Sequence, residues 1–232
     1  MCGRAALTTT PEDLRGALGL DETPELAPRY NIHPSQLVSV MRAQGRLELL
    51  RWGLVPAWAK DTKIGQKLAL ARLETIGSKP AFREAVRHRR CLVIVSGFYE
   101  WHRAGTKTST PFLFRRSDEK AFALAGVWER WVSRDGEIVE SCAIVTQAAR
   151  PPVQAVHDRM PVMLEREAWE RWLDPTVSLT GATGGSDHSE LVALAVGSHV
   201  NDPRNDDSEC MRAAGEPMQR GLFASAPSRP SN

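Results

Sequence analysis

The sequence predicts an α+β fold, a β-rich single domain with an antiparallel, barrel-like sheet and peripheral helices. Apolar runs typical of strands occur at residues 36–41, 47–51, 91–96, 112–116, 122–128 and 138–147. Helical patterns are fewer than these strands and do not alternate with them. This order is typical of an antiparallel sheet with helices outside it, and it argues against a doubly wound parallel sheet.

Three segments have the pattern of a helix. The first starts at Thr10, whose hydroxyl can cap a helix, and continues into Pro11, which suits the first helical position. Gly19 is its expected end. Residues 80–90 form the second segment, and residues 164–173 form an amphipathic third one.

The domain organisation follows from composition along the chain. We expect one domain over residues 1–212 and a disordered C-terminal tail over residues 213–232, because Pro, Ser, Gly and Ala replace apolar periodicity there. Residues 180–186 (TGATGGS) predict a flexible loop. No internal repeat is visible in the sequence.

Charge and hydropathy exclude several classes of protein. The 232 residues hold 30 Lys and Arg against 28 Asp and Glu, a net charge of +2, so no general field of either sign surrounds the chain. A local basic groove is compatible with that balance. No apolar run approaches the roughly 20 residues that a membrane span needs, and the first residues lack a signal peptide's apolar stretch. These features predict a soluble cytoplasmic protein without a membrane partner.

The four cysteines predict neither a disulfide scaffold nor a metal site. They lie at positions 2, 91, 142 and 210, and no two have the spacing of a zinc-binding pair. Cys91 and Cys142 lie in strand-like runs, where we expect them to be small buried apolar residues.

Cys2 has a different chemistry once Met1 is removed. A chain that starts with cysteine carries an α-amine, with a pKa of about 7.7–8.0, and a thiol, with a pKa of about 8.5, on adjacent carbons. The amine can condense with an aldehyde to a Schiff base, and the tethered thiolate can close a five-membered thiazolidine on it. The alternative is that Cys2 is incidental and the terminus frays.

Three internal segments add acid–base and cationic groups. Glu100 follows a continuous apolar strand among aromatic residues, which would raise its pKa; alternatively it is an exposed turn residue. His157 is a candidate proton carrier beside Arg159, or a structural histidine. Arg72 and Glu74 lie in an apolar setting, as a functional pair or as a buried structural ion pair.

Several short motifs occur in one order, and together they resemble one family. The motifs are residues 1–4 (MCGR), 29–34 (RYNIHP), 52–58 (WGLVPAW), 71–75 (ARLET), 97–101 (GFYEW), 157–161 (HDRMP) and 200–206 (VNDPRND). This ordered set resembles the SRAP family, the SOS-response-associated peptidase-like proteins that shield abasic sites. The resemblance extends from residue 2 to about residue 210.

The resemblance implies a function and assigns roles to residues. Family members bind single-stranded DNA and link an N-terminal cysteine to the ring-opened aldehyde of an abasic site through a thiazolidine. By resemblance, Cys2 is the nucleophile, Glu100 the catalytic carboxylate and His157 the active-site histidine. The remaining positions, which would contact phosphates or flank the bases, are Arg4, Arg72, Arg159, Trp52 and Trp58.

The resemblance also sets expectations about partners and location. It implies a β-rich domain with a cationic groove, and single-stranded DNA with abasic sites as partner. We expect no cofactor, and the Cys and His spacings predict no metal. We expect a monomer in the cytoplasm, associated with the nucleoid. For Trp52 and Trp58, packing in the core is the alternative to a wall beside the DNA.

The sequence departs from the family pattern at one active-site position. The family motif is Asn-Ala-Arg-x-Glu-Thr, and Leu70 stands where that asparagine is expected. A leucine cannot hydrogen-bond the reacting groups, and the loss of such a contact costs on the order of a hundredfold in rate. Three hypotheses therefore stay open: an abasic-site crosslinker, an N-terminal-nucleophile hydrolase that cleaves a peptide or amide bond, and a non-catalytic single-strand binding module.

Overall fold

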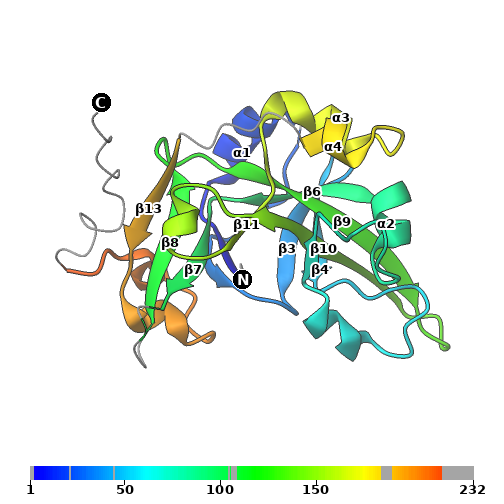
Figure 1. The fold of residues 1–232 in the computed structure, drawn as a ribbon, viewed down its shortest axis with the longest axis horizontal. Coiled ribbons are helices and arrows are strands. Elements are labelled where there is room, and N and C mark those ends of the chain that lie inside the picture. The colour runs from blue at the N-terminus through cyan, green and yellow to red at the C-terminus, as the bar shows by residue number, and fades with distance from the viewer. Residues whose placement is uncertain are drawn as a thin grey trace, which may run out of the picture.

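Five strands close into a small barrel in the computed structural model. They are β3 (Leu37–Met41), β4 (Leu47–Trp52), β6 (Arg90–Val95), β9 (Phe122–Val132) and β10 (Ile138–Ala148). Neighbours pair antiparallel around the barrel, except that β10 closes onto β4 in parallel. The structure describes residues 3–20, 22–43, 45–103, 105, 109–183 and 190–215. The predicted β-rich α+β fold with a barrel-like sheet is confirmed (Figure 1).

A second, antiparallel sheet lies beside the barrel. Its strands, in spatial order, are β13 (Leu191–Ala195), β8 (Thr110–Arg116), β7 (Gly97–His102), β1 (Arg4–Leu7) and β2 (Arg29–Ile32). β6 and β7 are separated by a single residue, so the chain passes directly from the barrel into this sheet. Figure 1 shows β7, β8 and β13 to one side of the barrel strands.

Three short strands extend the barrel along β9 and β10. β5 (Leu70–Arg72) pairs with β10 in parallel, and β11 (Arg159–Pro161) pairs with β10 antiparallel. β12 (Met163–Leu164) pairs with β9. Because β5 and β11 both pair with the last residues of β10, the segment before β11 and the segment after β5 are brought to one region of the molecule.

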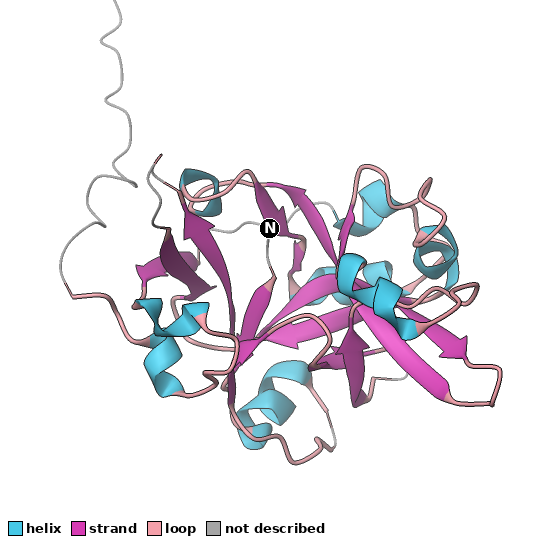
Figure 2. Ribbon diagram, turned by 90° about the horizontal axis from the view of Figure 1, so that it is seen from below, coloured by secondary structure: helices cyan, strands magenta, loops and turns pink. Residues whose placement is uncertain are grey.

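The helices are short and lie at the periphery of the strands (Figure 2). α1 (Pro11–Leu18) begins as predicted, since the Thr10 hydroxyl accepts the Asp13 N–H, and it ends at Gly19 in the left-handed conformation. The others are α2 (Arg83–His88), α3 (Trp169–Leu173), α4 (Leu179–Thr183) and the 3₁₀ segments η1 (Thr62–Lys67), η2 (Val153–Ala155), η3 (Arg166–Ala168), η4 (Ser198–Asn201) and η5 (Ser208–Met211).

Two sequence predictions in this part of the chain need correction. The helix expected over residues 164–173 is confined to α3 and the turn before it, because Leu164 pairs with Ala123 as part of β12. The loop expected over residues 180–186 starts inside α4, which buries Ala182 against the core. Residues 184–189 lie outside the described part of the chain.

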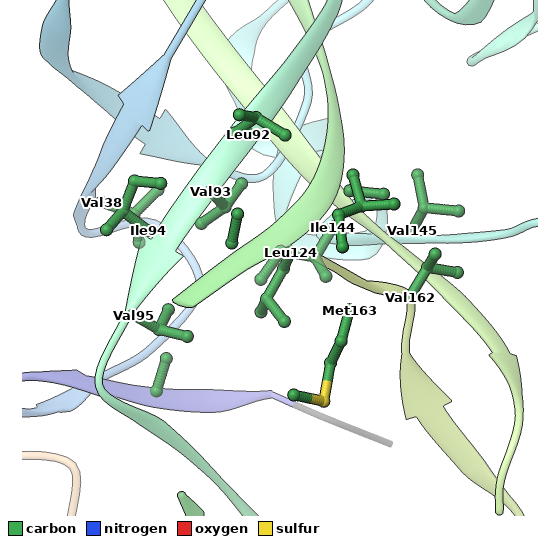
Figure 3. Packing of buried hydrophobic residues seen from close by; sticks show 14 of the residues in the cluster. Val38, Leu92, Val93, Ile94, Val95, Leu124, Ile144, Val145, Val162 and Met163 are labelled. Atoms are coloured by element: carbon green, nitrogen blue, oxygen red, sulfur yellow. The ribbon is translucent and has the colours of Figure 1, made fainter. Parts of the chain in front are cut away.

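The main hydrophobic core joins side chains of the barrel strands to others from α1, α3 and the second sheet. Val93, Leu124 and Ile144 come from three adjacent strands and lie in the cluster that Figure 3 shows. Cys91 and Cys142 are fully buried in this core, which confirms the prediction for both, and burial raises the pKa of each thiol. Burial of apolar area on this scale is the main stabilising contribution to the fold.

A tight backbone contact explains why the chain leaves regular structure after β4. Gly53 has a φ of 123°, and a Cβ placed there would lie 2.6 Å from the carbonyl oxygen of Gly65. Only glycine tolerates both that φ and that approach. The segment after Trp52 is therefore held against η1 instead of continuing as a strand.

The end of the described chain is still hydrogen-bonded. Ala213 forms an isolated bridge with Val196, and the Ala214 N–H donates to the Ala195 carbonyl. Residues 216–232, most of the predicted tail, lie outside the described residues, and the predicted domain boundary stays a prediction. Among the described residues, no helix has the length and apolar character needed to traverse a bilayer.

Candidate active site

An open cleft of about 750 Å³ lies at the junction of β1, β7 and the turn before β11. Antiparallel pairing sets β1 directly beside β7, with Arg4 opposite Tyr99. The turn between η2 and β11 contributes the opposite wall. The described residues that line the cleft are Gly3, Arg4, Glu100, Trp101, Arg103, Ser109, Val156, His157, Asp158 and Asn201.

Glu100 is the buried acid of this cleft. It lies in β7, where it pairs with Phe112 of β8, and only 1% of the residue is exposed. Burial raises its pKa from the ordinary value of 4.5 to about 7, and the nearby negative charge of Asp158 adds to the rise. A carboxyl group with this pKa exists in both protonation states near neutral pH, so it can donate and accept a proton.

His157 also lines the cleft, and its imidazole is able to carry a proton near neutral pH. Its Nδ1 lies 2.9 Å from the backbone nitrogen of Arg159 and 2.8 Å from a carboxylate oxygen of Asp158. The neutral ring accepts the Arg159 N–H at Nδ1 and carries its proton on Nε2, whereas the protonated ring donates from Nδ1 to Asp158. Burial lowers the pKa of His157, which favours the neutral ring.

Arg4 is held by the protein itself. One guanidinium nitrogen donates to Asn31 Oδ1 and to the Val200 carbonyl, both at 2.7 Å. The guanidinium also lies 5.7 Å from the ring centroid of Trp101, within cation–π range. Arg4 therefore braces the wall of the cleft, and fewer of its donors are available for phosphate than the sequence suggested.

Of the two alternatives for Arg72 and Glu74, the buried structural ion pair is wrong. Glu74 instead forms a bidentate ion pair with Arg159, with N···O distances of 2.7 and 2.9 Å. Half of the Glu74 side chain is exposed. Arg159 also donates to the Thr146 carbonyl. Arg72 is exposed, and among the described residues no hydrogen bond or ion pair holds its side chain. Of these two arginines, Arg72 is the one open to a phosphate.

The two tryptophans have different environments. Trp52 is fully buried and its indole N–H donates to the Ala69 carbonyl at 2.9 Å, so its predicted place beside the DNA is wrong and it is a core residue. Trp58 is 61% exposed and can stack on a base. Leu70 is partly buried against the barrel core and is not among the described residues that line the cleft.

The structure adds residues that the sequence analysis did not assign. Asn201 accepts the Trp101 indole N–H at 2.7 Å, and Asp158 lies beside His157. Both residues lie in the sequence motifs described above, but those motifs assigned them no role. Arg103 and Ser109 also line the cleft, and they flank a segment whose sequence carries no motif.

Cys2 lies outside the described residues, whereas the next residue, Gly3, is described. Gly3 lines the cleft that contains Glu100 and His157. Of the sequence-predicted site residues, the structure brings Arg4, Glu100 and His157 together there.

These features define a class of protein: a strand-rich domain whose N-terminal segment leads into a cleft equipped for proton transfer. A family model described as "SOS response associated peptidase (SRAP)" matches residues 1–203. The chain belongs to this family, as the ordered motifs indicated.

Curated relatives and a solved structure agree with that membership. The protein is 37% identical over 223 residues to the abasic site processing protein YoaM of Bacillus subtilis, covering 92% of this chain and 98% of the relative. It is 30% identical over 202 residues to the abasic site processing protein YedK of Escherichia coli, covering 83% and 86%. A crystal structure from Bacteroides thetaiotaomicron shares the fold, with a TM-score of 0.81 at 24% identity, covering 92% of this chain and all of that one.

Proposed function

We propose that this protein binds single-stranded DNA and forms a covalent thiazolidine crosslink between Cys2, exposed by removal of Met1, and the aldehyde of an abasic site. The observation that carries the proposal is the cleft in which Gly3 meets Glu100 and His157. The names of the relatives, which process abasic sites, supply the substrate class.

The reaction starts with opening of the abasic sugar. The closed hemiacetal loses the proton of its C1 hydroxyl while the ring oxygen gains one, which gives the aldehyde. The Cys2 amine adds to the aldehyde carbon and water leaves, forming an imine. The thiolate then adds to the imine carbon and the nitrogen takes up a proton, which closes the thiazolidine. The net reaction releases one water and needs no oxidant or reductant.

Each proton transfer has a carrier in the cleft. Glu100, with a pKa of about 7, can protonate the sugar ring oxygen and later accept a proton from the amine. His157 in its neutral form presents an Nε2–H that can assist departure of water. A closed sugar without these carriers would open slowly, so both are proposed as catalytic residues.

Recognition of the DNA would rest on exposed cationic and aromatic groups, of which Arg103 lines the cleft. Arg72 and Arg103 are exposed cations, and backbone phosphates bind such groups without regard to base sequence. Trp58 offers an exposed aromatic face for a base next to the lesion. A missing base removes stacking, which lowers the cost of turning the abasic sugar toward the cleft.

Mass spectrometry of the protein with an abasic single-stranded oligonucleotide tests the proposal. We expect loss of Met1 and a mass equal to protein plus DNA minus one water. Cys2→Ala should abolish the stable adduct, and Cys2→Ser should give only an imine that borohydride traps. Cys142→Ala removes a buried thiol as the matched control and should crosslink like the wild type. An unchanged adduct in Cys2→Ala would exclude the thiazolidine.

A second candidate, a non-catalytic binding module, is favoured by Leu70. The side chain is apolar and packs toward the core where the family has a polar residue. Leu70→Asn should raise the crosslinking rate by up to about a hundredfold if the missing contact limits catalysis. Salt-sensitive DNA binding with no adduct in either variant would establish the binding module instead. Turnover of an amide substrate without DNA would point to the hydrolase.

A further inference from the structure

A cluster of metal-ligating side chains lies outside the cleft, on the segment between η4 and η5. His199, Asp207 and Cys210 each place one donor atom so that the three atoms lie within 4.8 Å of one another. His199 Nε2 is 3.1 Å from both carboxylate oxygens of Asp207. The sequence spacing gave no sign of this cluster, because the turn between the two 3₁₀ segments brings Cys210 back against His199.

The donor set has the character of a zinc site. Imidazole nitrogen, thiolate sulfur and carboxylate oxygen are the three ligand types that Zn²⁺ takes in proteins, at about 2.0–2.3 Å. His199 and Asp207 are exposed, whereas Cys210 is buried beneath them. We propose that His199, Asp207 and Cys210 bind a zinc-type divalent cation, with water as the fourth ligand.

Binding requires a thiolate and a neutral imidazole. The thiol of Cys210 releases its proton to solvent, and His199 coordinates through one ring nitrogen while the other nitrogen carries its single proton. The Asn205 side-chain nitrogen lies 3.2 Å from His199 Nδ1 and donates to the His199 carbonyl at 2.8 Å, which orients the imidazole beside Asp207.

The cation would fix the segment that holds Arg4 at the cleft. The carbonyls of Val200 and Asn201, next to His199, accept hydrogen bonds from Arg4. The carbonyl of Asn205 accepts one from Asn31. Joining η4 to η5 through a metal therefore constrains the same backbone groups that position the cleft wall, although the site itself does not depend on the proposed DNA chemistry.

Cobalt titration of the full-length protein tests the site without DNA. The protein is reduced and treated with chelator, then titrated with Co²⁺, whose thiolate complexes show a charge-transfer band in the near ultraviolet. We expect one equivalent of Co²⁺ to give this band and one equivalent of Zn²⁺ to remove it. His199→Ala, at an exposed position, should weaken Co²⁺ binding at least tenfold. His88→Ala, an exposed histidine on α2, is the matched control and should bind like the wild type.

A second pair of variants separates this site from the N-terminal aminothiol. Cys2→Ala should keep the band and Cys210→Ala should lose it. A band lost in Cys2→Ala and kept in His199→Ala would overturn the proposal, as would no bound Co²⁺ at all. Zn²⁺ should raise the thermal midpoint of the wild type and leave that of His199→Ala unchanged; equal shifts in both would count against the site.

Discussion

Replacing Glu100 by glutamine changes one property that the structure quantifies, the dependence of stability on pH. Glu100 is buried in β7 and its carboxyl group has a pKa of about 7 in the folded protein, against an ordinary value of 4.5. Between these two values the unfolded chain has lost the proton while the folded chain keeps it. Stability from this group is therefore present below pH 4.5 and is lost as pH rises to about 7.

The magnitude follows from the difference in pKa. Each unit corresponds to about 1.4 kcal/mol, so ionising Glu100 in place costs roughly 3 kcal/mol of folding free energy. Glutamine has nearly the same shape and cannot ionise. The free energy of unfolding of Glu100→Gln, relative to that of the wild type, should therefore increase by about 3 kcal/mol between pH 4.5 and pH 7.5. At higher pH this difference should stay constant.

Urea unfolding at a series of pH values measures this difference directly. Glu170→Gln on the exposed side of α3 is the matched control, and its curve should follow the wild type. The same variants serve in the crosslinking assay, where Glu100→Gln should be slow at every pH. If the stabilities of Glu100→Gln and the wild type run parallel from pH 4.5 to 7.5, the assignment of Glu100 as a buried proton carrier is refuted.

Four further variants test the two tryptophans, Arg72 and Glu74. Trp52→Ala should lower the free energy of unfolding by about 3–5 kcal/mol, because it empties a core position. Trp58→Ala should change stability by less than about 0.5 kcal/mol yet weaken single-strand binding by about 1–3 kcal/mol in a fluorescence titration; equal effects of both variants on stability would contradict the burial difference. Arg72→Ala should lower the slope of log affinity against log salt by about 0.7, and an unchanged slope would exclude a phosphate contact. Glu74→Gln releases Arg159 from its ion pair and should tighten binding at low salt; weaker binding would mean that Glu74 positions Arg159 for the DNA.

Local sequence patterns predicted those helices and strands whose conformation is decided by residues adjacent in the sequence. Thr10, Pro11 and Gly19 set the ends of α1 through capping and φ preferences, which act over a few residues. The apolar run after residue 90 predicted β6 for the same reason. The helix expected from residue 164 was wrong at its start because the pairing of Leu164 with β9, a contact between distant segments, outweighs helical periodicity.

The candidate site was predicted in part. The motifs identified Glu100 and His157, and the cleft brings both together. They could not show that Trp52 is buried in the core, since the same aromatic residue type occurs both in cores and on binding surfaces. They also could not show that Glu74 pairs with Arg159 across 85 positions of sequence.

The sequence by itself determined the family and the strand-rich class, and it predicted Glu100 and His157 as acid–base residues, because these depend on residue type and order along the chain. Only the tertiary structure decided which arginines are engaged by the protein, which tryptophan faces solvent, and that a buried carboxyl group at Glu100 has a pKa of about 7. Those properties depend on desolvation and on partners brought together by strand pairing, and both arise only when the chain closes into its barrel and adjoining sheet.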